Sequence, residues 1–256
     1  MSSRSVTFET KCYEKDWEIL IRTGRLEAMI RRNCFDFAER VLYINNVNDP
    51  ERVRYYAERL KARGVITEHI LVDEHADEAL AFFGLDRDSF RGGYYYSVQE
   101  LVGLYRCKTD YLLHFSGDSV LEGAFPWIDP ALDRLEQDPR VKVATCLWNG
   151  RAAEAEAESL EQDDDFWLGY GFSDQCYLVR TSDLRAPIYG ERHPDSERFP
   201  VYGGELFEKR VDAWLRTHGY LRAVSKRGGY RHKNFSNSRL VRTAGRLLGI
   251  YGCTSD

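Results

Sequence analysis

Apolar runs alternate with amphipathic segments along the first half of the chain. Three runs of β-prone residues predict strands, at 5–9, 40–44 and 68–72. The segments between them carry apolar residues at helical spacing and predict helices around 17–21, at 26–33 and at 50–63. The third helix has both end signals, because Asp49 and Pro50 open it and Gly64 closes it. This alternation predicts an α/β fold with a mostly parallel central sheet flanked by helices.

The second half continues the pattern with one long interruption. Further helices are predicted at 97–106, 130–137 and 205–218, and further strands at 111–115, 141–147, 176–179 and 221–224. The interruption at 151–165 is rich in Ala, Glu and Asp, so we expect a mobile, solvated excursion. The last helix, 238–250, has arginines on one side and apolar residues elsewhere. We expect it to pack on the body or to contact an anionic membrane or a partner subunit.

Composition narrows the classes of protein that remain. The net charge of -5 argues against a chain that coats nucleic acid. No stretch of 18 apolar residues exists and the chain begins with polar residues, so we expect a cytoplasmic protein. The six cysteines lie far apart without a metal-binding spacing, which predicts reduced thiols. We expect one domain over residues 1–235, followed by a basic amphipathic helix and tail over 236–256.

Polar residues follow three of the predicted strands where each one ends. They are Glu9, Thr10 and Lys11, then Asn45 and Asn46, then Ser116, Gly117 and Asp118. Ligands of open α/β sheets bind at the carboxyl ends of strands, so these residues would lie side by side if their strands are adjacent. Asp118 is a lone carboxylate between two apolar runs, and we expect it to hold Mg²⁺ or Mn²⁺. Arg231, in the basic cluster 226–233, is a candidate for contacts with a diphosphate.

The order of elements over 5–232 resembles the GT-A glycosyltransferases, particularly the large inverting family that uses nucleotide-diphosphate sugars. In that family the first strand ends in a polar motif that touches the nucleotide, and Glu9, Thr10 and Lys11 stand there. The second strand usually ends in acidic residues that hold the base or ribose. This chain has Asn45 and Asn46 at that place.

The resemblance also implies a metal site and a catalytic base. The family's Asp-x-Asp motif corresponds to Ser116, Gly117 and Asp118, of which only the second carboxylate is kept. His232 stands where several members close the metal shell with a histidine. Glu205, after Gly203 and Gly204, stands where the family places its base, and Asp174 and Glu208 are reserve carboxylates. Aromatic residues nearby are candidates either for stacking on an acceptor sugar or for the core, namely Phe166, Trp167, Tyr170 and Phe172.

The leading hypothesis is a metal-dependent, inverting transferase that moves a sugar from a nucleotide-diphosphate sugar to an acceptor hydroxyl. The acceptor would be a sugar, a lipid-linked molecule or another small molecule, and no nucleic acid is expected. A retaining transferase shares the fold. A sugar nucleotidyltransferase would need a Gly-rich basic loop after the first strand, which residues 9–13 do not supply. The alternative outside catalysis is a nucleotide-sugar-binding protein with a decayed metal motif, which Ser116 would permit.

Overall fold

The computed structural model describes residues 4–251, without the side chains of Tyr202 and Arg239, and places ten strands in one sheet. The strands are β1 (Val6–Cys12), β2 (Glu39–Ile44), β3 (Glu68–Leu71), β4 (Tyr111–Phe115), β5 (Ser119–Leu121), β6 (Val141–Trp148), β7 (Ser159–Gln162), β8 (Phe166–Gly169), β9 (Cys176–Arg180) and β10 (Leu221–His232). The helices are α1 (Trp17–Arg22), α2 (Arg25–Arg31), α3 (Pro50–Ala62), α4 (Ala76–Phe83), α5 (Tyr94–Arg106), α6 (Ile128–Gln137), α7 (Ala152–Ala157), α8 (Thr181–Leu184), α9 (Phe207–Thr217) and α10 (Arg239–Leu247).

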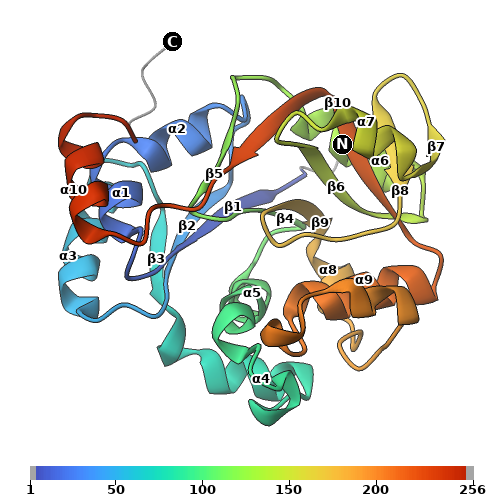
Figure 1. Cartoon of the computed structure of the whole chain (residues 1–256), viewed down its shortest axis with the longest axis horizontal. Coiled ribbons are helices and arrows are strands. Elements are labelled where there is room, and N and C mark those ends of the chain that lie inside the picture. Colours follow the sequence, from blue (N-terminus) through green and yellow to red (C-terminus); the bar gives the residue numbers. More distant parts are fainter. Residues whose placement is uncertain (1–3, 252–256) are drawn as a thin grey trace.

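The sheet is mixed, with the order β3-β2-β1-β4-β9-β6-β10-β8-β7, and β5 pairs with the end of β10 (Figure 1). The strands β3, β2, β1 and β4 run parallel to one another, whereas β9 is antiparallel to both β4 and β6. The α/β class is confirmed, but the predicted mostly parallel pairing holds only for β3-β2-β1-β4 and for β6 beside β10. The reason is that β8 and β9 are joined by residues 170–175 without a helical crossover, so the local pattern did not determine their direction.

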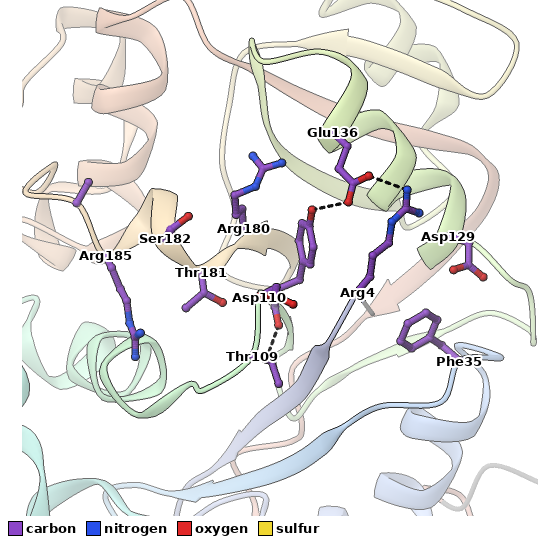
Figure 2. Close-up of a pocket in the computed structure, with 12 residues that line it drawn as sticks. Arg4, Phe35, Thr109, Asp110, Asp129, Glu136, Arg180, Thr181, Ser182 and Arg185 are labelled. Atoms are coloured by element: carbon purple, nitrogen blue, oxygen red, sulfur yellow. Dashed lines mark hydrogen bonds and ion pairs between the residues drawn. The ribbon is translucent and has the colours of Figure 1, made fainter. Parts of the chain in front are cut away.

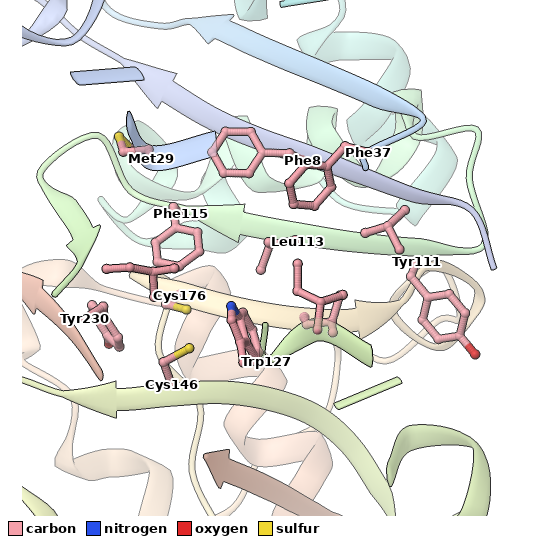
Figure 3. Packing of buried hydrophobic residues seen from close by; sticks show 14 of the residues in the cluster. Phe8, Met29, Phe37, Tyr111, Leu113, Phe115, Trp127, Cys146, Cys176 and Tyr230 are labelled. Atoms are coloured by element: carbon pink, nitrogen blue, oxygen red, sulfur yellow. The ribbon is translucent and has the colours of Figure 1, made fainter. Parts of the chain in front are cut away.

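Helices cover both faces of the sheet because successive residues of a strand point to opposite sides. Leu113 of β4 packs in the core under α1, α2, α3 and α6, where Phe8, Phe115 and Trp127 also lie (Figure 3). Leu112, its neighbour, packs in the second core under α4, α5 and α9. Strand β4 is therefore buried on both faces, and its carboxyl end is held firmly in place.

The segment 151–165, predicted to be a mobile, solvated excursion, has exposed or partly exposed side chains throughout, as predicted, but it has regular secondary structure. It forms α7 and β7, and β7 pairs with β8 at the edge of the sheet. Two of its carboxylates have basic partners, since Arg134 pairs with Asp163 and Arg227 Nη2 lies 2.5 Å from Asp165 Oδ1. The local composition could not show these pairs, because one partner comes from α6 and the other from β10.

Strand β10 is much longer than the predicted segment 221–224 and continues to His232. A register shift between Ser225 and Gly229 lets it keep pairing with β6 while it passes through the basic cluster. Its last residues then pair antiparallel with β5, and His232 lies opposite Ser119. This extension brings a residue near the end of the chain beside the loop that follows β4.

Helix α10 rests on the body through its arginine side. Arg246 Nη2 lies 3.2 Å from Glu18 Oε2 on α1, while Leu240 and Leu247 are 82% and 77% exposed. Arg246 therefore makes a contact with the body, and Leu240 and Leu247 face solvent. The predicted contact with a membrane surface or partner subunit, and the domain boundary at 235, stay predictions. Within residues 4–251, no helix has both the length and the apolar character needed to span a bilayer.

The described cysteines agree with the prediction of reduced thiols. Cys12, Cys107, Cys146 and Cys176 are buried, Cys34 is exposed, and all five are free. Cys253 lies outside the described residues.

Candidate functional site

A cavity of about 590 Å³ opens where β2, β1 and β4 end side by side, as the sequence predicted. Its walls include seven of the predicted site residues, Lys11, Asn45, Asn46, Ser116, Gly117, Asp118 and His232. We call it the Asp118 cavity. The parallel register, with Cys12 opposite Ile44 and Thr10 opposite Phe115, aligns the three strand ends and explains why residues far apart in the chain meet here.

Asp118 and His232 form the polar centre of this cavity. His232 Nε2 lies 3.2 Å from Asp118 Oδ2, and the Ser116 hydroxyl donates to Asp118 Oδ1 at 2.9 Å. Burial alone would raise the pKa of Asp118, but the hydrogen bonds from His232 and Ser116 outweigh it and lower that pKa. The contact with Asp118 likewise outweighs burial at His232 and raises its pKa. Asp118 is therefore a carboxylate anion at neutral pH.

Gly117 is required by the close approach of two loops. A Cβ at this position would lie 2.7 Å from the Lys11 carbonyl oxygen and 3.2 Å from Asp16 Oδ2. The Gly117 carbonyl also accepts a hydrogen bond from Arg25 Nε at 3.1 Å. The residue between Ser116 and Asp118 thus serves to seat the carboxylate against β1.

Replacing Gly117 with alanine is expected to lower the free energy of unfolding by about 1–3 kcal/mol, because the backbone oxygen of Lys11 cannot move aside. Urea unfolding measures this loss. Gly123→Ala is the matched control, since a Cβ there would meet nothing within 4 Å. Equal stability of the two variants would contradict this account of the loop.

Lys11 reaches the cavity, whereas Glu9 and Thr10 do not. Lys11 Nζ pairs with the buried Glu100 of α5 and lies 3.8 Å from Asp174 Oδ2. Glu9 and Thr10 are buried inside β1, which continues to Cys12, so neither lies at the strand's end as predicted. The Glu9 side chain instead contacts a buried histidine in β4, with Oε1 3.0 Å from His114 Nδ1. Burial raises the pKa of Glu9 and lowers that of His114.

The two asparagines after β2 have different tasks. The Asn45 side chain is buried in the cavity wall, and its Oδ1 has no hydrogen-bond partner among the described residues. Asn46 adopts a φ of 51°, which asparagine tolerates well, and its Nδ2 donates to the Tyr95 carbonyl oxygen at 3.2 Å. Asn46 therefore joins this loop to the start of α5. The exposed rings of Tyr95 and Tyr96 line the cavity beside it.

A second cavity, of about 470 Å³, lies beyond the loop 173–175. We call it the Arg222 cavity. Asp174 lines the Asp118 cavity, Glu208 of α9 lines the Arg222 cavity, and Gln175 lines both. The Asp174 backbone N–H donates to Glu208 Oε2 at 3.4 Å. Burial, together with the charges of Asp174 and Glu100, raises the pKa of Glu208 to about 8. The two reserve carboxylates of the sequence thus meet where the two cavities adjoin.

Glu205 and Arg231 line neither cavity. Helix α9 begins at Phe207, so Glu205 precedes it, and its Oε1 pairs with Lys209 Nζ at 3.2 Å. The Arg231 side chain is 70% exposed and lies 3.4 Å from Glu122 Oε1. Its neighbour His232 faces the cavity, so the alternation of β10 directs Arg231 to the other side.

Other wall residues were not singled out from the sequence. In the Asp118 cavity they include Asp16, Lys15, Tyr95 and Asn234. Asp16 precedes an apolar helix and so has the pattern of an ordinary helix start, although it is buried against the loop of Gly117. Of the predicted aromatic residues, Phe166 and Phe172 are buried in the cores, and Phe172 also lines the Arg222 cavity.

The donor atoms around Asp118 suit a divalent cation that takes further ligands from a substrate. Within residues 4–251, no group of three or more His, Cys, Asp or Glu side chains is arranged to hold a metal. Asp118 and His232 offer one carboxylate and one imidazole. Mg²⁺ is usually bound by one or two carboxylates together with substrate phosphates and water. Asp118 therefore fits an ion completed by a diphosphate, and His232 adds a ligand when its imidazole is neutral.

A larger cavity, of about 1210 Å³, lies at the opposite end of β4 and is lined by Arg4, Tyr111 and Glu136 among others (Figure 2). Several of its charged side chains have partners within the protein. Arg4 Nη2 donates to Glu136 Oε2 at 2.6 Å, and the Tyr111 hydroxyl donates to Oε1 at 2.9 Å. Arg185 donates to the carbonyl oxygens that end α5. These bonds join α6 to the sheet and the end of α8 to the end of α5, which is a structural role.

Comparison with known proteins identifies the fold. No protein-family model matches the chain, and no curated protein matches its sequence. The structure of GalNAc-T7 with UDP, GalNAc and Mn²⁺ superposes with a TM-score of 0.59 at 10% identity, over 92% of this chain and 45% of that one. Glucosyl-3-phosphoglycerate synthase from Mycobacterium tuberculosis, with Mg²⁺ and UDP, gives 0.50 at 14% identity, over 100% and 82%. A mycobacterial protein gives 0.51 at 14%, over 96% and 74%.

The chain therefore has the GT-A fold, the fold of nucleotide-sugar glycosyltransferases. It spans less than half the length of the GalNAc-T7 chain.

Proposed function

We propose that this chain transfers a sugar from a nucleotide-diphosphate sugar to an acceptor hydroxyl, with the donor in the Asp118 cavity and the acceptor in the Arg222 cavity. The observation that carries the proposal is the contact between Asp118 and His232 at the carboxyl end of β4. Ligands of open α/β sheets bind at this edge. The GT-A structures of GalNAc-T7 and glucosyl-3-phosphoglycerate synthase were determined with UDP and with Mn²⁺ or Mg²⁺.

The donor is bound through its diphosphate and its base. Asp118 and His232 would hold Mn²⁺ or Mg²⁺, which neutralises the charge that develops on the leaving diphosphate. Lys15 and Lys11 add cationic side chains at the wall. The unpartnered Oδ1 of Asn45 can accept a hydrogen bond from a base, and the ring of Tyr95 offers a surface for stacking.

We assign the catalytic base to Glu208, in place of the Glu205 suggested by the order of elements. Glu208 lies where the two cavities adjoin, beside Asp174, whereas Glu205 lines neither. The Glu208 carboxylate takes the proton from the acceptor hydroxyl. At the same time the hydroxyl oxygen bonds to the anomeric carbon, and the bond from that carbon to the diphosphate breaks. Direct displacement of this kind inverts the anomeric centre. A sugar product with retained configuration would contradict this route.

Turnover of nucleotide sugars tests the function directly. The full chain is incubated with Mn²⁺ and a panel of nucleotide-diphosphate sugars, and release of nucleoside diphosphate is measured with and without acceptors. We expect slow hydrolysis of one donor and faster release when an acceptor is present. Binding of nucleoside diphosphate without any release across the panel and acceptors would contradict the proposal.

A binding protein without activity is the second candidate. It is favoured by Ser116, whose hydroxyl occupies the place of the motif's first carboxylate and bonds to Asp118. Such a protein would bind the nucleotide sugar equally well in Mn²⁺ and in a chelator. The transferase is expected to need the metal.

The pH dependence of transfer follows from Glu208. Burial, together with the charges of Asp174 and of Glu100 in α5, raises its pKa to about 8, against the opposing charge of Lys11. Because the base acts only when deprotonated, the transfer rate is expected to rise about tenfold per pH unit below the pKa and to level off above it. Initial rates at saturating donor between pH 6 and 9.5 measure this profile. A rate that does not change over this range would exclude Glu208 as the base.

A further inference from the structure

Arg222 places a guanidinium in the wall of the Arg222 cavity. It is the second residue of β10, opposite Gly169 of β8 and Val143 of β6. Its neighbours Leu221 and Ala223 point into the core of the opposite face, while Arg222 and Val224 line the cavity. The central sheet therefore fixes the position from which this side chain reaches the cavity.

The guanidinium of Arg222 makes no hydrogen bond to any residue in the described part of the chain. The Arg222 side chain is only 20% exposed, and its Nε is buried without a hydrogen-bond partner. The carboxylate paired with it, Glu158, lies 3.9 Å away and belongs to a side chain that is 70% exposed. A guanidinium has five N–H donors, and withdrawing them from water without acceptors destabilises the fold.

The backbone is shaped to admit this side chain. A Cβ at Gly171 would lie 3.3 Å from Arg222 Nη1 and 3.4 Å from Cζ, so the guanidinium packs against the bare backbone there. Gly171 also has a φ of 118°, which side chains rarely allow. Gly171, near the start of the loop that contains Asp174, therefore leaves space for the Arg222 guanidinium.

The other arginines of this wall already have partners. Arg198 donates to both carboxylate oxygens of Asp212, at 2.8 and 2.9 Å. Arg151 donates to Glu154 at 2.9 Å and stacks on Trp148. Because the pKa of Glu208 is about 8, its carboxyl is mostly neutral at pH 7 and does not offset the charge of Arg222. Among the arginines of this wall, Arg222 is the one whose guanidinium has no hydrogen-bond partner among the described residues and can bind a ligand.

We propose that Arg222 binds an oxyanion of the acceptor, so that the acceptor of this enzyme carries a carboxylate or phosphate group. The fork of a guanidinium matches two oxygens of either group. The inference rests on the proposed function only in calling the ligand an acceptor, because the anion site itself can be tested without turnover. A cavity of about 470 Å³ has room for a small anionic molecule.

Inorganic phosphate is the probe for the site itself. Thermal unfolding is followed with increasing phosphate in the presence of UDP and Mg²⁺, which keep phosphate out of the Asp118 cavity. We expect phosphate to raise the Tm of the wild type and of Arg151→Gln, the matched control from the same wall, and to leave Arg222→Gln unchanged. An equal rise in Arg222→Gln, or no rise in the wild type, would overturn the proposal.

Matched acceptors test the chemistry of the ligand. Release of UDP is compared within two sets, glycerol with glycerol 3-phosphate and glycerate, and glucose with glucose 6-phosphate and glucuronate. We expect kcat/KM for one anionic member to exceed that of its neutral relative by about 10- to 100-fold, the worth of charge-assisted hydrogen bonds. Arg222→Gln should remove this ratio, whereas Arg151→Gln, the matched control from the same wall, should keep it. The preferred member shows whether the group is phosphate or carboxylate.

The two readouts separate failure of the inference from failure of the function. A neutral acceptor preferred by the wild type, or a ratio that survives in Arg222→Gln, contradicts the anionic acceptor. If no member of either set is used, the phosphate titration decides. Loss of all UDP-sugar turnover with phosphate binding that still depends on Arg222 would contradict the transferase and leave the anion site standing.

The stability of Arg222→Met separates binding from a structural role. Methionine keeps the apolar stem and removes a buried charge that has no hydrogen-bond acceptor. We therefore expect the Tm of Arg222→Met without phosphate to equal or exceed that of the wild type. A clearly lower Tm, with the response to phosphate retained, would assign Arg222 to the fold.

Discussion

Glu208→Gln is expected to lower the rate of sugar transfer by at least about 100-fold, the smaller end of what a general base contributes. Glutamine has nearly the same shape but cannot take the proton of the acceptor hydroxyl. Because Glu208 lies across the loop 173–175 from the Asp118 cavity, affinity for nucleoside diphosphate should stay unchanged. Initial rates with the preferred donor and acceptor, together with calorimetric titration of UDP, measure both quantities.

Glu205→Gln is the matched control for this prediction. Both residues are glutamates near the start of α9, but Glu205 pairs with Lys209 and lines neither cavity. We expect this variant to keep most of its activity and the pH profile of the wild type. Loss of activity in Glu205→Gln, with Glu208→Gln still active, would move the base to Glu205. Comparable losses in both variants would show that neither assignment is sufficient.

Asp118→Ala is expected to abolish metal-dependent binding of nucleoside diphosphate. The change removes the carboxylate that His232 and Ser116 hold in its charged form. Loss of even an outer hydrogen-bond partner of a metal ligand weakens a metal site by about 10- to 100-fold, so loss of the ligand itself should cost at least that much. Calorimetric titration of UDP with Mn²⁺, and again with a chelator, measures the effect.

The control variant for Asp118→Ala changes another carboxylate that has a cationic partner but does not line the Asp118 cavity. Asp165 pairs with Arg227 beside β8, and Asp165→Asn should bind UDP with Mn²⁺ like the wild type. Full binding by the wild type in the chelator would contradict metal dependence and favour the binding protein. Unchanged binding by Asp118→Ala in Mn²⁺ would remove Asp118 from the site.

The position of Asp118 could be predicted because it depends on local pattern. The apolar run 111–115 is observed as β4 with the same bounds, and the polar residues that follow it lie at the edge of the sheet. The end of β2 was equally clear, because Asp49 and Pro50 start the next helix. By contrast, β1 continues past Glu9 and Thr10 to Cys12. Its end could not be predicted, because these two polar residues are buried inside the strand and resemble the polar residues that follow a strand.

The sequence by itself determined the α/β class, strand β4 and the position of Asp118 after its end. Each depends on periodicity or on a short motif, which act between neighbours in the chain. The tertiary structure decided that Glu208 and not Glu205 meets Asp174, and that Arg222 lacks a partner. Both features depend on residues 170–175, which connect β8 to β9. This connection passes beside α9 and β10. Contacts between segments more than thirty residues apart follow from how the sheet is assembled, and no local pattern encodes them.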